Sequence, residues 1–214
     1  MAGYKVFITA TDTDAGKTWV TTAAVGSLLA QGVQAKAMKP VACGLDDVGR
    51  NNDVEALLAA QNFSRADQIN LYRFAMPAAP SQAAAAEGVA VDPSALVQWC
   101  RDQSNGIETC LIEGVGGLMT PLTDRWLVSD WIEAMPDYEV WLGVGCKLGA
   151  INQTLLTLAK LEQMERLPTR VFFNAISAEH NAWIEPTQNA VAPFLNSDCE
   201  ISILKFGECP ELRR

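Results

Sequence analysis

The fold of this chain is decided by residues 9–18, which read Thr9-Ala10-Thr11-Asp12-Thr13-Asp14-Ala15-Gly16-Lys17-Thr18. An apolar run, Tyr4–Thr9, leads into this stretch, and a helical pattern over Lys17–Gln31 follows it. A loop that binds phosphate needs inward-pointing backbone N–H groups, a lysine for the β- and γ-phosphates and a hydroxyl for magnesium. Gly16-Lys17-Thr18 supplies the second half of such a loop, although the standard first glycine would fall at Thr11. The stretch therefore predicts a phosphate-binding loop between a buried strand and a helix.

Strands and helices alternate along the rest of the chain. The predicted strands are Tyr4–Thr9, Gln34–Met38, Thr109–Glu113, Glu139–Val144, Arg170–Asn174 and Glu200–Leu204. The predicted helices are Lys17–Gln31, Asp53–Ala60, Pro93–Gln103, Val128–Ala134, Ile151–Glu165 and Trp183–Leu195, with a loop entering a short helix over Ala78–Ala86. This order predicts an α/β fold of the P-loop nucleoside triphosphate hydrolase type, a mostly parallel sheet flanked by helices, in one domain over residues 1–214. Ligands bind such sheets at the carboxyl ends of the strands.

Composition narrows the classes of function. The 214 residues are 49% hydrophobic and 19% charged, a mixture that buries a substantial core. Sixteen basic and 25 acidic residues give a net charge of −9, which repels DNA and anionic membranes, so we expect neither a nucleic-acid nor a membrane partner. No uninterrupted apolar run reaches about 18 residues, the length of a transmembrane helix. Because the N-terminal apolar stretch is also too short for a secretory signal, we expect a cytoplasmic protein.

Cysteine and histidine content excludes two kinds of site. The six cysteines are scattered without a CxxC pair or zinc spacing, which predicts reduced thiols. The chain has a single histidine, His180, which is poor material for a Ser/His/Asp triad.

Further candidate residues stand at the ends of the predicted strands. Lys39, in Lys39-Pro40-Val41-Ala42-Cys43-Gly44, follows the second strand and reaches the same pocket as the loop, unless it is a solvated lysine before a turn. Asp53 stands at a helix start, where a carboxylate serves as a cap or dipole partner as readily as it binds a ligand. Glu113 ends an apolar strand, a pattern typical of acids that organise magnesium in nucleotide hydrolases. The glycines of Gly114-Val115-Gly116-Gly117 let the backbone approach phosphate, or they form a plain turn.

Two candidates follow later strands. The stretch Val144–Asn152 predicts a helix start whose free N–H groups bind a carboxylate; otherwise Asn152 is a helix cap. Asn174 also ends a strand, but Asn174-Ala175-Ile176-Ser177 lacks the Asn-Lys-x-Asp pattern that selects guanine. In the helix predicted at Ile151–Glu165, one apolar face is formed by Ile151, Leu155, Leu158 and Ala159.

Taken in order, these motifs resemble those of the dethiobiotin synthetase family, ATP-dependent enzymes of biotin synthesis. The resemblance covers roughly residues 4–175. It rests on Thr11–Thr18, Lys39–Ala42, Asn51–Asp53, Glu113–Gly117 with Thr120–Leu122, and Lys147–Asn152. The phosphate loop of this family is longer than the standard loop by one residue, which accounts for the misfit at Thr11.

The resemblance implies a reaction of ATP, CO2 and a small-molecule diamine, 7,8-diaminononanoate. The diamine takes up CO2 as a carbamate, ATP phosphorylates the carbamate, and the second amine closes the ring of dethiobiotin with release of phosphate. Lys17 would hold the transferring phosphate and Lys39 the carbamate, as catalytic residues, and Thr18, Asp53 and Glu113 would hold Mg²⁺. The family is also homodimeric, with the substrate carboxylate bound across the interface at Gly149–Asn152.

The resemblance also implies two sets of contact residues. The ATP-binding residues would be Asp14, Ala15, Gly16, Lys17, Thr18, Trp19, Asp53, Glu113, Gly114, Val115, Gly116 and Asn174, the last of these at adenine. The substrate-binding residues would be Thr13, Cys43, Gly149, Ala150, Ile151 and Asn152.

Three positions depart from the family pattern, and two other functions stay open. Ala10 replaces a glycine, Asp14 a glutamate and Cys43 a hydroxyl residue. One alternative is a P-loop ATPase that acts as a partitioning or assembly switch. Such switches carry a second lysine early in the loop, where this chain has Thr11-Asp12-Thr13. The other alternative, favoured by the departures at Ala10 and Cys43, is a nonenzymatic nucleotide-binding subunit.

Overall fold

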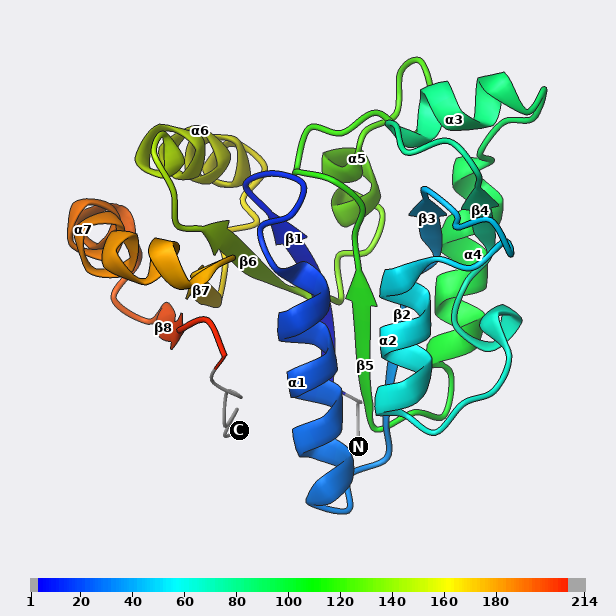
Figure 1. The fold of residues 1–214 in the computed structure, drawn as a ribbon, viewed down its shortest axis with the longest axis horizontal. Coiled ribbons are helices and arrows are strands. Elements are labelled where there is room, and N and C mark those ends of the chain that lie inside the picture. The colour runs from blue at the N-terminus through cyan, green and yellow to red at the C-terminus, as the bar shows by residue number, and fades with distance from the viewer. Residues whose placement is uncertain (1–3, 208–214) are drawn as a thin grey trace.

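The central sheet has six parallel strands in the order β2-β5-β1-β6-β7-β8 (Figure 1). The computed structural model describes residues 4–207. The strands of this sheet are β1 (Tyr4–Ala10), β2 (Ala35–Met38), β5 (Thr109–Glu113), β6 (Glu139–Gly145), β7 (Arg170–Asn174) and β8 (Glu200–Leu204). Because β1 lies in the middle of this order, the loop after it is placed at the centre of the edge where ligands bind.

Helices follow most of these strands and cover both faces of the sheet (Figure 1). They are α1 (Lys17–Ala30), α2 (Asn52–Ala60), α3 (Pro80–Ala86), α4 (Pro93–Ser104), α5 (Val128–Glu133), α6 (Ala150–Gln163) and α7 (Asn181–Val191). The predicted α/β fold with a mostly parallel sheet is thus confirmed.

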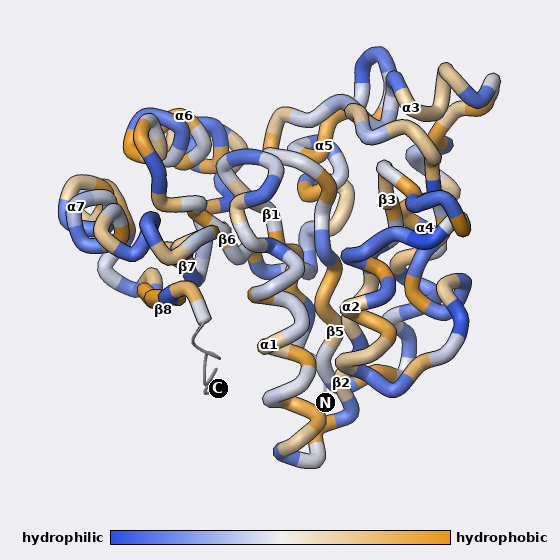
Figure 2. Tube along the Cα trace, viewed as in Figure 1, coloured by the Kyte–Doolittle hydropathy of each residue, from blue (hydrophilic) through white to orange (hydrophobic). Residues whose placement is uncertain are grey.

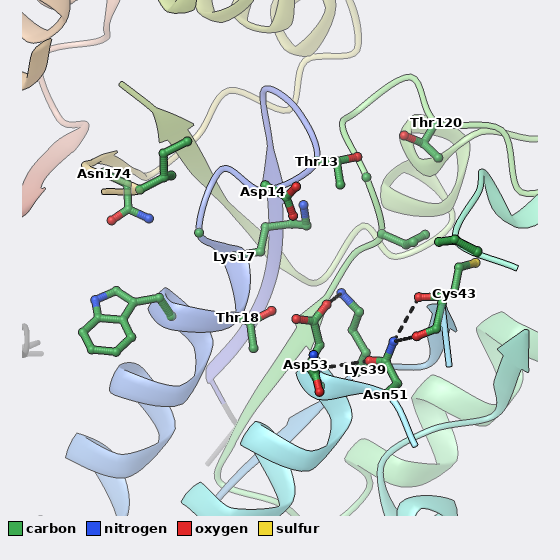
Figure 3. Close-up of a pocket in the computed structure, with 18 of the residues that line it drawn as sticks. Thr13, Asp14, Lys17, Thr18, Lys39, Cys43, Asn51, Asp53, Thr120 and Asn174 are labelled. Carbon is green, nitrogen blue, oxygen red and sulfur yellow. Dashed lines mark hydrogen bonds and ion pairs between the residues drawn. The ribbon is translucent and has the colours of Figure 1, made fainter. Parts of the chain in front are cut away.

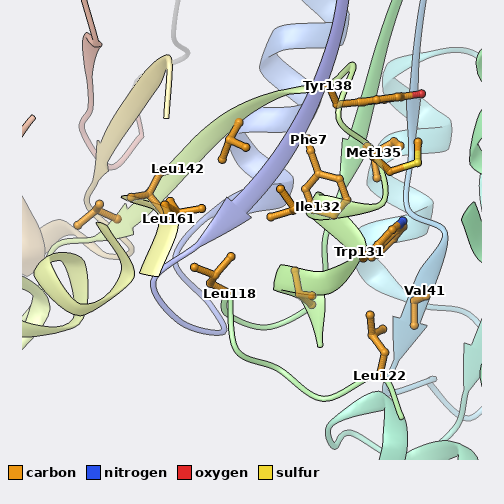
Figure 4. Packing of buried hydrophobic residues seen from close by; sticks show 14 of the residues in the cluster. Phe7, Val41, Leu118, Leu122, Trp131, Ile132, Met135, Tyr138, Leu142 and Leu161 are labelled. Carbon is orange, nitrogen blue, oxygen red and sulfur yellow. The ribbon is translucent and has the colours of Figure 1, made fainter. Parts of the chain in front are cut away.

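Alternation along β1 separates two apolar clusters. Val6 and Ile8 point to one face, where they belong to a buried cluster with side chains of α1 and α2. Phe7 points to the other face and meets the Trp131 ring of α5 edge-on, with centroids 4.9 Å apart. Figure 4 shows Phe7 and Trp131 among the neighbouring apolar side chains of this second cluster. Strands buried on both faces read as continuous apolar runs, and Figure 2 shows such a hydrophobic run along β5.

A second, two-stranded sheet was not predicted from the sequence. It consists of β3 (Val41–Cys43) and β4 (Tyr72–Phe74), paired in parallel. Three residues are too few to show a period, so the sequence analysis assigned no element to either segment. The small sheet places Cys43 beside the site described below.

Most predicted elements end within one or two residues of the observed ones, but the last helix differs more. It was predicted over Trp183–Leu195, and the observed α7 begins at Asn181 and ends at Val191, before a 3₁₀ turn at Ala192–Phe194. Pro193 lies in that turn, and proline lacks the N–H group that would continue an α-helix.

The predicted apolar face of α6 is wrong in part. Leu158 is buried as expected, but Ile151 is 40% exposed and Ala159 is exposed as well. The buried side of α6 instead uses Ala150, Thr154, Thr157, Leu158 and Leu161. An apolar strip therefore remains on the outer surface of this helix.

No helix within residues 4–207 combines the length and the apolar character needed to cross a membrane. The described cysteines, Cys43, Cys100, Cys110, Cys146 and Cys199, are free thiols. Cys209 lies outside the described residues.

Candidate active site

A cavity of about 1160 Å³ opens at the carboxyl ends of the strands. Twelve of the predicted site residues line it, namely Thr13, Asp14, Gly16, Lys17, Thr18, Trp19, Lys39, Cys43, Asp53, Val115, Gly116 and Asn174. They come from the loop after β1, the start of α1, the residues after β2 and β5, the end of β3, the first turn of α2 and the end of β7. Figure 3 shows how the labelled members surround the cavity. Residues far apart in the sequence thus meet because parallel strands end at one edge.

The loop after β1 is held in place by a neighbouring strand. Gly16 has a φ of +85°, and a Cβ added there would lie 1.6 Å from Nδ2 of Asn174. The same amide donates a hydrogen bond to the carbonyl oxygen of Ala15, at 3.0 Å. Only glycine fits this position, because it tolerates the left-handed backbone and leaves room for the amide. The Asn174 side chain therefore supports the loop through its Nδ2 atom, and its Oδ1 atom does not take part in this hydrogen bond.

The departure at Ala10 is accommodated within the sheet. Ala10 is fully buried and pairs in register with Gly143 of β6. The next residue, Thr11, donates its N–H to the carbonyl oxygen of Gly143 at 3.0 Å. The methyl group therefore lies against a glycine, and the ladder continues into the loop without interruption.

Lys17 begins α1 and is almost completely buried. Its Nζ donates to the carbonyl oxygen of Asp12 at 3.3 Å. Burial, together with the positive charge of Lys39, lowers the pKa of Lys17 to about 8, although Glu113 and Asp53 oppose this shift. A positive group in such surroundings is stabilised by any anion that enters the cavity.

Lys39 and Glu113 become neighbours through the register of the sheet. Met38 of β2 pairs with Ile112 of β5, so the residues that follow them emerge side by side. Nζ of Lys39 lies 2.6 Å from Oε1 of Glu113 and 3.2 Å from Oδ2 of Asp53. Burial by itself would lower the pKa of Lys39, but the two carboxylates outweigh it and raise the pKa. The same ammonium holds the pKa of Asp53 below its usual range, against the effect of burial.

The donor set around Glu113 fits a divalent cation. Oε1 of Glu113 accepts a hydrogen bond from the Thr18 hydroxyl at 2.7 Å. The Lys39 ammonium contacts both this carboxylate and that of Asp53, so the two acids lie near each other. Oε2 of Glu113 is buried and has no hydrogen-bond partner among the described residues. Carboxylate and hydroxyl oxygens are the ligands that Mg²⁺ prefers. The predicted metal residues Thr18, Asp53 and Glu113 are therefore brought together.

Asn51 organises the site, yet the sequence reasoning gave it no role. Its Oδ1 caps α2 by accepting from the N–H groups of Asp53 and Val54, and its Nδ2 donates to the carbonyl oxygens of Cys43 and Gly44 at 3.0 Å each. The interpretation of Asp53 as the helix cap is thus wrong, which leaves its carboxylate for Lys39. Asn51 lies within a motif that carried the family resemblance, and that was the signal available for it.

Cys43 and Thr120 face the cavity from two other segments. Burial raises the pKa of the Cys43 thiol to about 11, so it stays protonated at neutral pH. Thr120 was quoted only as part of a motif. Its Oγ1 accepts the N–H of Gly117 at 2.9 Å, and a Cβ at Gly116 would lie 2.3 Å from that oxygen. Gly116 is therefore packed tightly against Thr120, whereas a Cβ at Gly114 would meet Phe7 and Ile8 instead.

Several predicted residues do not line the cavity. Ala15, Glu113 and Gly114 lie behind its wall, where Glu113 and the Gly114 carbonyl oxygen contact Lys39. Gly149–Asn152 lies outside this cavity. Gly149 is the cap residue of α6, with a φ of +90°, so the interpretation of Asn152 as the cap is wrong. Both Gly149 and Asn152 are exposed to solvent.

One ionic contact links the phosphate loop to this helix. Oδ2 of Asp12 lies 3.2 Å from Nζ of Lys147 and 3.1 Å from Nε2 of Gln153. Burial would raise the pKa of Asp12, but Lys147 and the N–H of Thr13 outweigh it and lower the pKa. The loop after β1 and the start of α6 are thus joined by side chains.

Comparisons with known proteins agree with this geometry. Residues 4–211 match a protein family described as an AAA domain. The ATP-dependent dethiobiotin synthetase BioD of Aliivibrio fischeri (strain MJ11) is 36% identical over 162 residues, which cover 73% of this chain and 70% of that protein.

Solved structures show the same fold at low identity. The hydrogenase maturation factor HypB of Archaeoglobus fulgidus has a TM-score of 0.55 at 14% identity, covering 97% of this chain and 84% of that one. The signal recognition particle receptor FtsY of Elizabethkingia anophelis has a TM-score of 0.52 at 15% identity and covers 98% of this chain. This chain spans 61% of the FtsY chain. These two likenesses concern the fold alone.

Proposed function

The chain belongs to the family of ATP-dependent dethiobiotin synthetases, and on this premise we propose that it converts 7,8-diaminononanoate, CO2 and ATP into dethiobiotin, ADP and phosphate. One amine of the diamine attacks CO2 and loses a proton to give a carbamate. A carbamate oxygen attacks the γ-phosphorus of ATP, and ADP leaves. The second amine then attacks the carbamate carbon and loses a proton, and the C–O bond to phosphate breaks as the ring closes.

The observation that carries the proposal is that two buried lysines, Lys17 and Lys39, line one cavity beside the half-exposed carboxylate of Asp53, with the buried carboxylate of Glu113 behind its wall. Phosphoryl transfer needs positioned charge rather than covalent help from the protein. Lys17 stands at the start of α1, where the loop N–H groups and the helix end also favour a phosphate group. In the strand order of the sheet, Lys39 after β2 and Lys17 after β1 lie on either side of Glu113 at the end of β5. Lys39 is the group that would hold the carbamate and its developing charge.

We assign the Mg²⁺ ligands to Thr18, Asp53 and Glu113. The unpartnered Oε2 of Glu113 and the hydroxyl of Thr18 support this assignment. When bound, the cation neutralises charge on the phosphate oxygens. The protein's own part is to keep both carboxylates and the hydroxyl on one side of the cavity.

The nucleotide is assigned to the loop and its surroundings. Asp14, Ala15, Gly16 and the glycines after Glu113 would contact the phosphates through the backbone. Trp19 and Asn174 line the same cavity and would contact the base. Because the Asn174 amide group donates to Ala15, its oxygen is the atom available to accept from the exocyclic amine of adenine.

The diamine is assigned to the side of the cavity formed by Thr13 and Cys43. Its carboxylate would be held by the N–H groups at Gly149–Asn152 of a second subunit, because this helix start lies outside the cavity of its own chain. A homodimer is supported by the exposed apolar side chains of Leu148, Ile151 and Leu156, which are 83%, 40% and 64% exposed.

The location we propose is the cytoplasm. The reaction consumes ATP, and free thiols are typical of a reducing compartment.

Turnover by the purified protein tests the proposed function. The assay contains ATP, Mg²⁺, bicarbonate and 7,8-diaminononanoate, and the product is identified by mass. We expect dethiobiotin, with ATP consumed only when both the diamine and bicarbonate are present. ATP hydrolysis that responds to a protein or to DNA, but not to the diamine, would instead indicate a switch ATPase. Nucleotide binding without any turnover would indicate a nonenzymatic subunit.

A further inference from the structure

The Lys39 ammonium already has three partners among the described residues. An ammonium has three N–H donors and no acceptor. Nζ of Lys39 donates hydrogen bonds to Oε1 of Glu113 at 2.6 Å and to the carbonyl oxygen of Gly114 at 3.0 Å, and it forms an ion pair with Oδ2 of Asp53 at 3.2 Å. In this arrangement two of the three donors are used, and the ion pair with Asp53 also holds the ammonium beside the carboxylates. The ammonium can therefore turn more than one N–H group to a carbamate only if one of these contacts breaks.

Two of these partners are the carboxylates that would also bind a divalent cation. Oε1 of Glu113 accepts hydrogen bonds from both Lys39 and Thr18. The ammonium therefore shares this acceptor with Thr18, which is the third proposed Mg²⁺ ligand. Mg²⁺ binds oxygen at about 2.1 Å and repels a neighbouring ammonium strongly where water is excluded. The cation and the ammonium therefore compete for the carboxylates of Asp53 and Glu113.

We propose that a divalent cation displaces the Lys39 ammonium from Asp53 and Glu113, and that this displacement frees Lys39 to bind substrate. The proposal rests on the proposed function only for what Lys39 then binds. Gly114 is not among the metal residues, so its carbonyl oxygen remains a partner for Lys39 after the carboxylates are taken. Lys39 also lines the cavity, so the freed N–H groups have space to face. The consequence is an order of events, in which the cation precedes productive contact between Lys39 and the carbamate.

Lys17 offers a matched control within the same cavity. It carries the same charge, is buried to a similar degree and also lines the cavity, but it donates its hydrogen bond to the carbonyl oxygen of Asp12 rather than to a carboxylate. Removing either lysine deletes one positive charge near the carboxylates. Only the removal of Lys39 also vacates the position between Asp53 and Glu113.

The test measures Mn²⁺ affinity by electron paramagnetic resonance in the absence of nucleotide. Lys39→Met should bind Mn²⁺ at least about tenfold more tightly than the wild type, and Lys17→Met should change it by less than about threefold. Circular dichroism confirms that each variant is folded. If Lys39→Met does not fold, Lys39→Gln replaces it, because its amide still donates to Glu113. Equal Mn²⁺ affinity in the wild type and the Lys39 variant would overturn the proposal, and so would equal tightening in the two lysine variants.

A second measurement uses the unaltered protein. Acetylation of lysines by acetic anhydride is followed by mass spectrometry with and without Mn²⁺, at a concentration that the resonance titration shows to be bound. Lys39 should react faster when Mn²⁺ is present, whereas Lys17 should not. An unchanged Lys39 rate would overturn the displacement. Neither measurement depends on turnover, so a protein that binds Mn²⁺ as expected but makes no dethiobiotin would contradict the proposed function alone.

Discussion

Two groups of residues at the ends of parallel strands differ in burial: Lys17, Lys39 and Glu113 on one side, and the start of α6 on the other. Lys17, Lys39 and Glu113 are at most 6% exposed and lie in or behind the wall of one cavity. Gly149 and Asn152 are exposed and lie outside that cavity. Groups that stabilise developing charge work best where water is excluded. One chain provides this exclusion for the proposed phosphate chemistry, whereas the start of α6 would be covered only in the proposed homodimer.

Lys17→Ala should have the largest effect, because it removes the charge that faces the transferring phosphate. We expect turnover to fall by about a thousandfold or more. The fold should persist, since the side chain contributes little to either apolar cluster. Turnover measured under saturating ATP and Mg²⁺ checks this. The matched control is Lys5→Ala, which loses a partly exposed ion pair with Asp137 and should keep its activity. Normal turnover in folded Lys17→Ala protein would remove the phosphate loop from the account.

Lys39→Gln should separate chemistry from nucleotide binding. The lost contact is made to the carbamate in the transition state, and such a contact is typically worth about 3–4 kcal/mol. Turnover should therefore fall by two to three orders of magnitude, while ATP affinity measured without a divalent cation changes little. The opposite pattern, near-normal turnover with strongly weakened ATP binding, would make Lys39 a nucleotide ligand.

Asp53 and Glu113 should behave as a coupled pair. If they share one cation, Asp53→Asn and Glu113→Gln each raise the Mg²⁺ concentration needed for half-maximal turnover, and the double variant loses less than the combined single effects. Coupling between residues that share a partner typically reaches about 0.5–3 kcal/mol. A double-mutant cycle on turnover measures it. Additive losses, within a few tenths of a kcal/mol, would show that the two carboxylates act separately.

The pKa of Lys17 predicts a pH dependence of nucleotide binding. Burial and the charge of Lys39 lower it to about 8, from an ordinary value of 10.5. A bound phosphate favours the charged form, so ATP affinity should fall by about tenfold for each pH unit above 8, with proton uptake on binding. Calorimetry in buffers of different ionisation enthalpy measures that proton. No uptake at pH 9 would contradict the assignment of Lys17 to phosphate.

The same shift has the opposite sign for stability. Between pH 8 and 10.5 the unfolded chain binds more protons at Lys17 than the native protein does. The contribution of Lys17 to the free energy of unfolding therefore increases as pH rises through this range. The loss of ATP affinity over this range therefore does not reflect unfolding through Lys17.

The buried half of the molecule was predictable from sequence, and the reason is physical. Strands buried on both faces, such as Thr109–Glu113, appear as continuous apolar runs and are found from the sequence. The edge strand Glu200–Leu204 was also predicted, although most of its residues are exposed. Parallel strands also end at one edge, which predicts that Lys17, Lys39 and Glu113 meet. The contact between Lys39 and Glu113 could not be predicted from the sequence, because it depends on the register of β2 beside β5.

The exposed half was predicted less well. Ile151 was assigned to the core because an apolar residue at helical spacing looks the same whether it faces the sheet or another subunit. The role of Asn51 was missed because α2 begins one residue earlier than predicted, and a cap is defined by the residue just before the helix. The strands β3 and β4 were missed because three residues show no period.

Subunit complementation tests the difference between the two regions most directly. Asn152→Asp places a negative charge where the substrate carboxylate would bind, on an exposed residue whose replacement spares the core. Mixed with Lys17→Ala protein, which is inactive for a different reason, it forms heterodimers after dissociation and reassociation. If α6 of one subunit serves the site of the other, the site with intact Lys17 also receives an intact α6. The mixture should then recover about a quarter of the wild-type activity. Verified heterodimers without recovered activity would contradict the account, as would an active monomer in a sedimentation experiment.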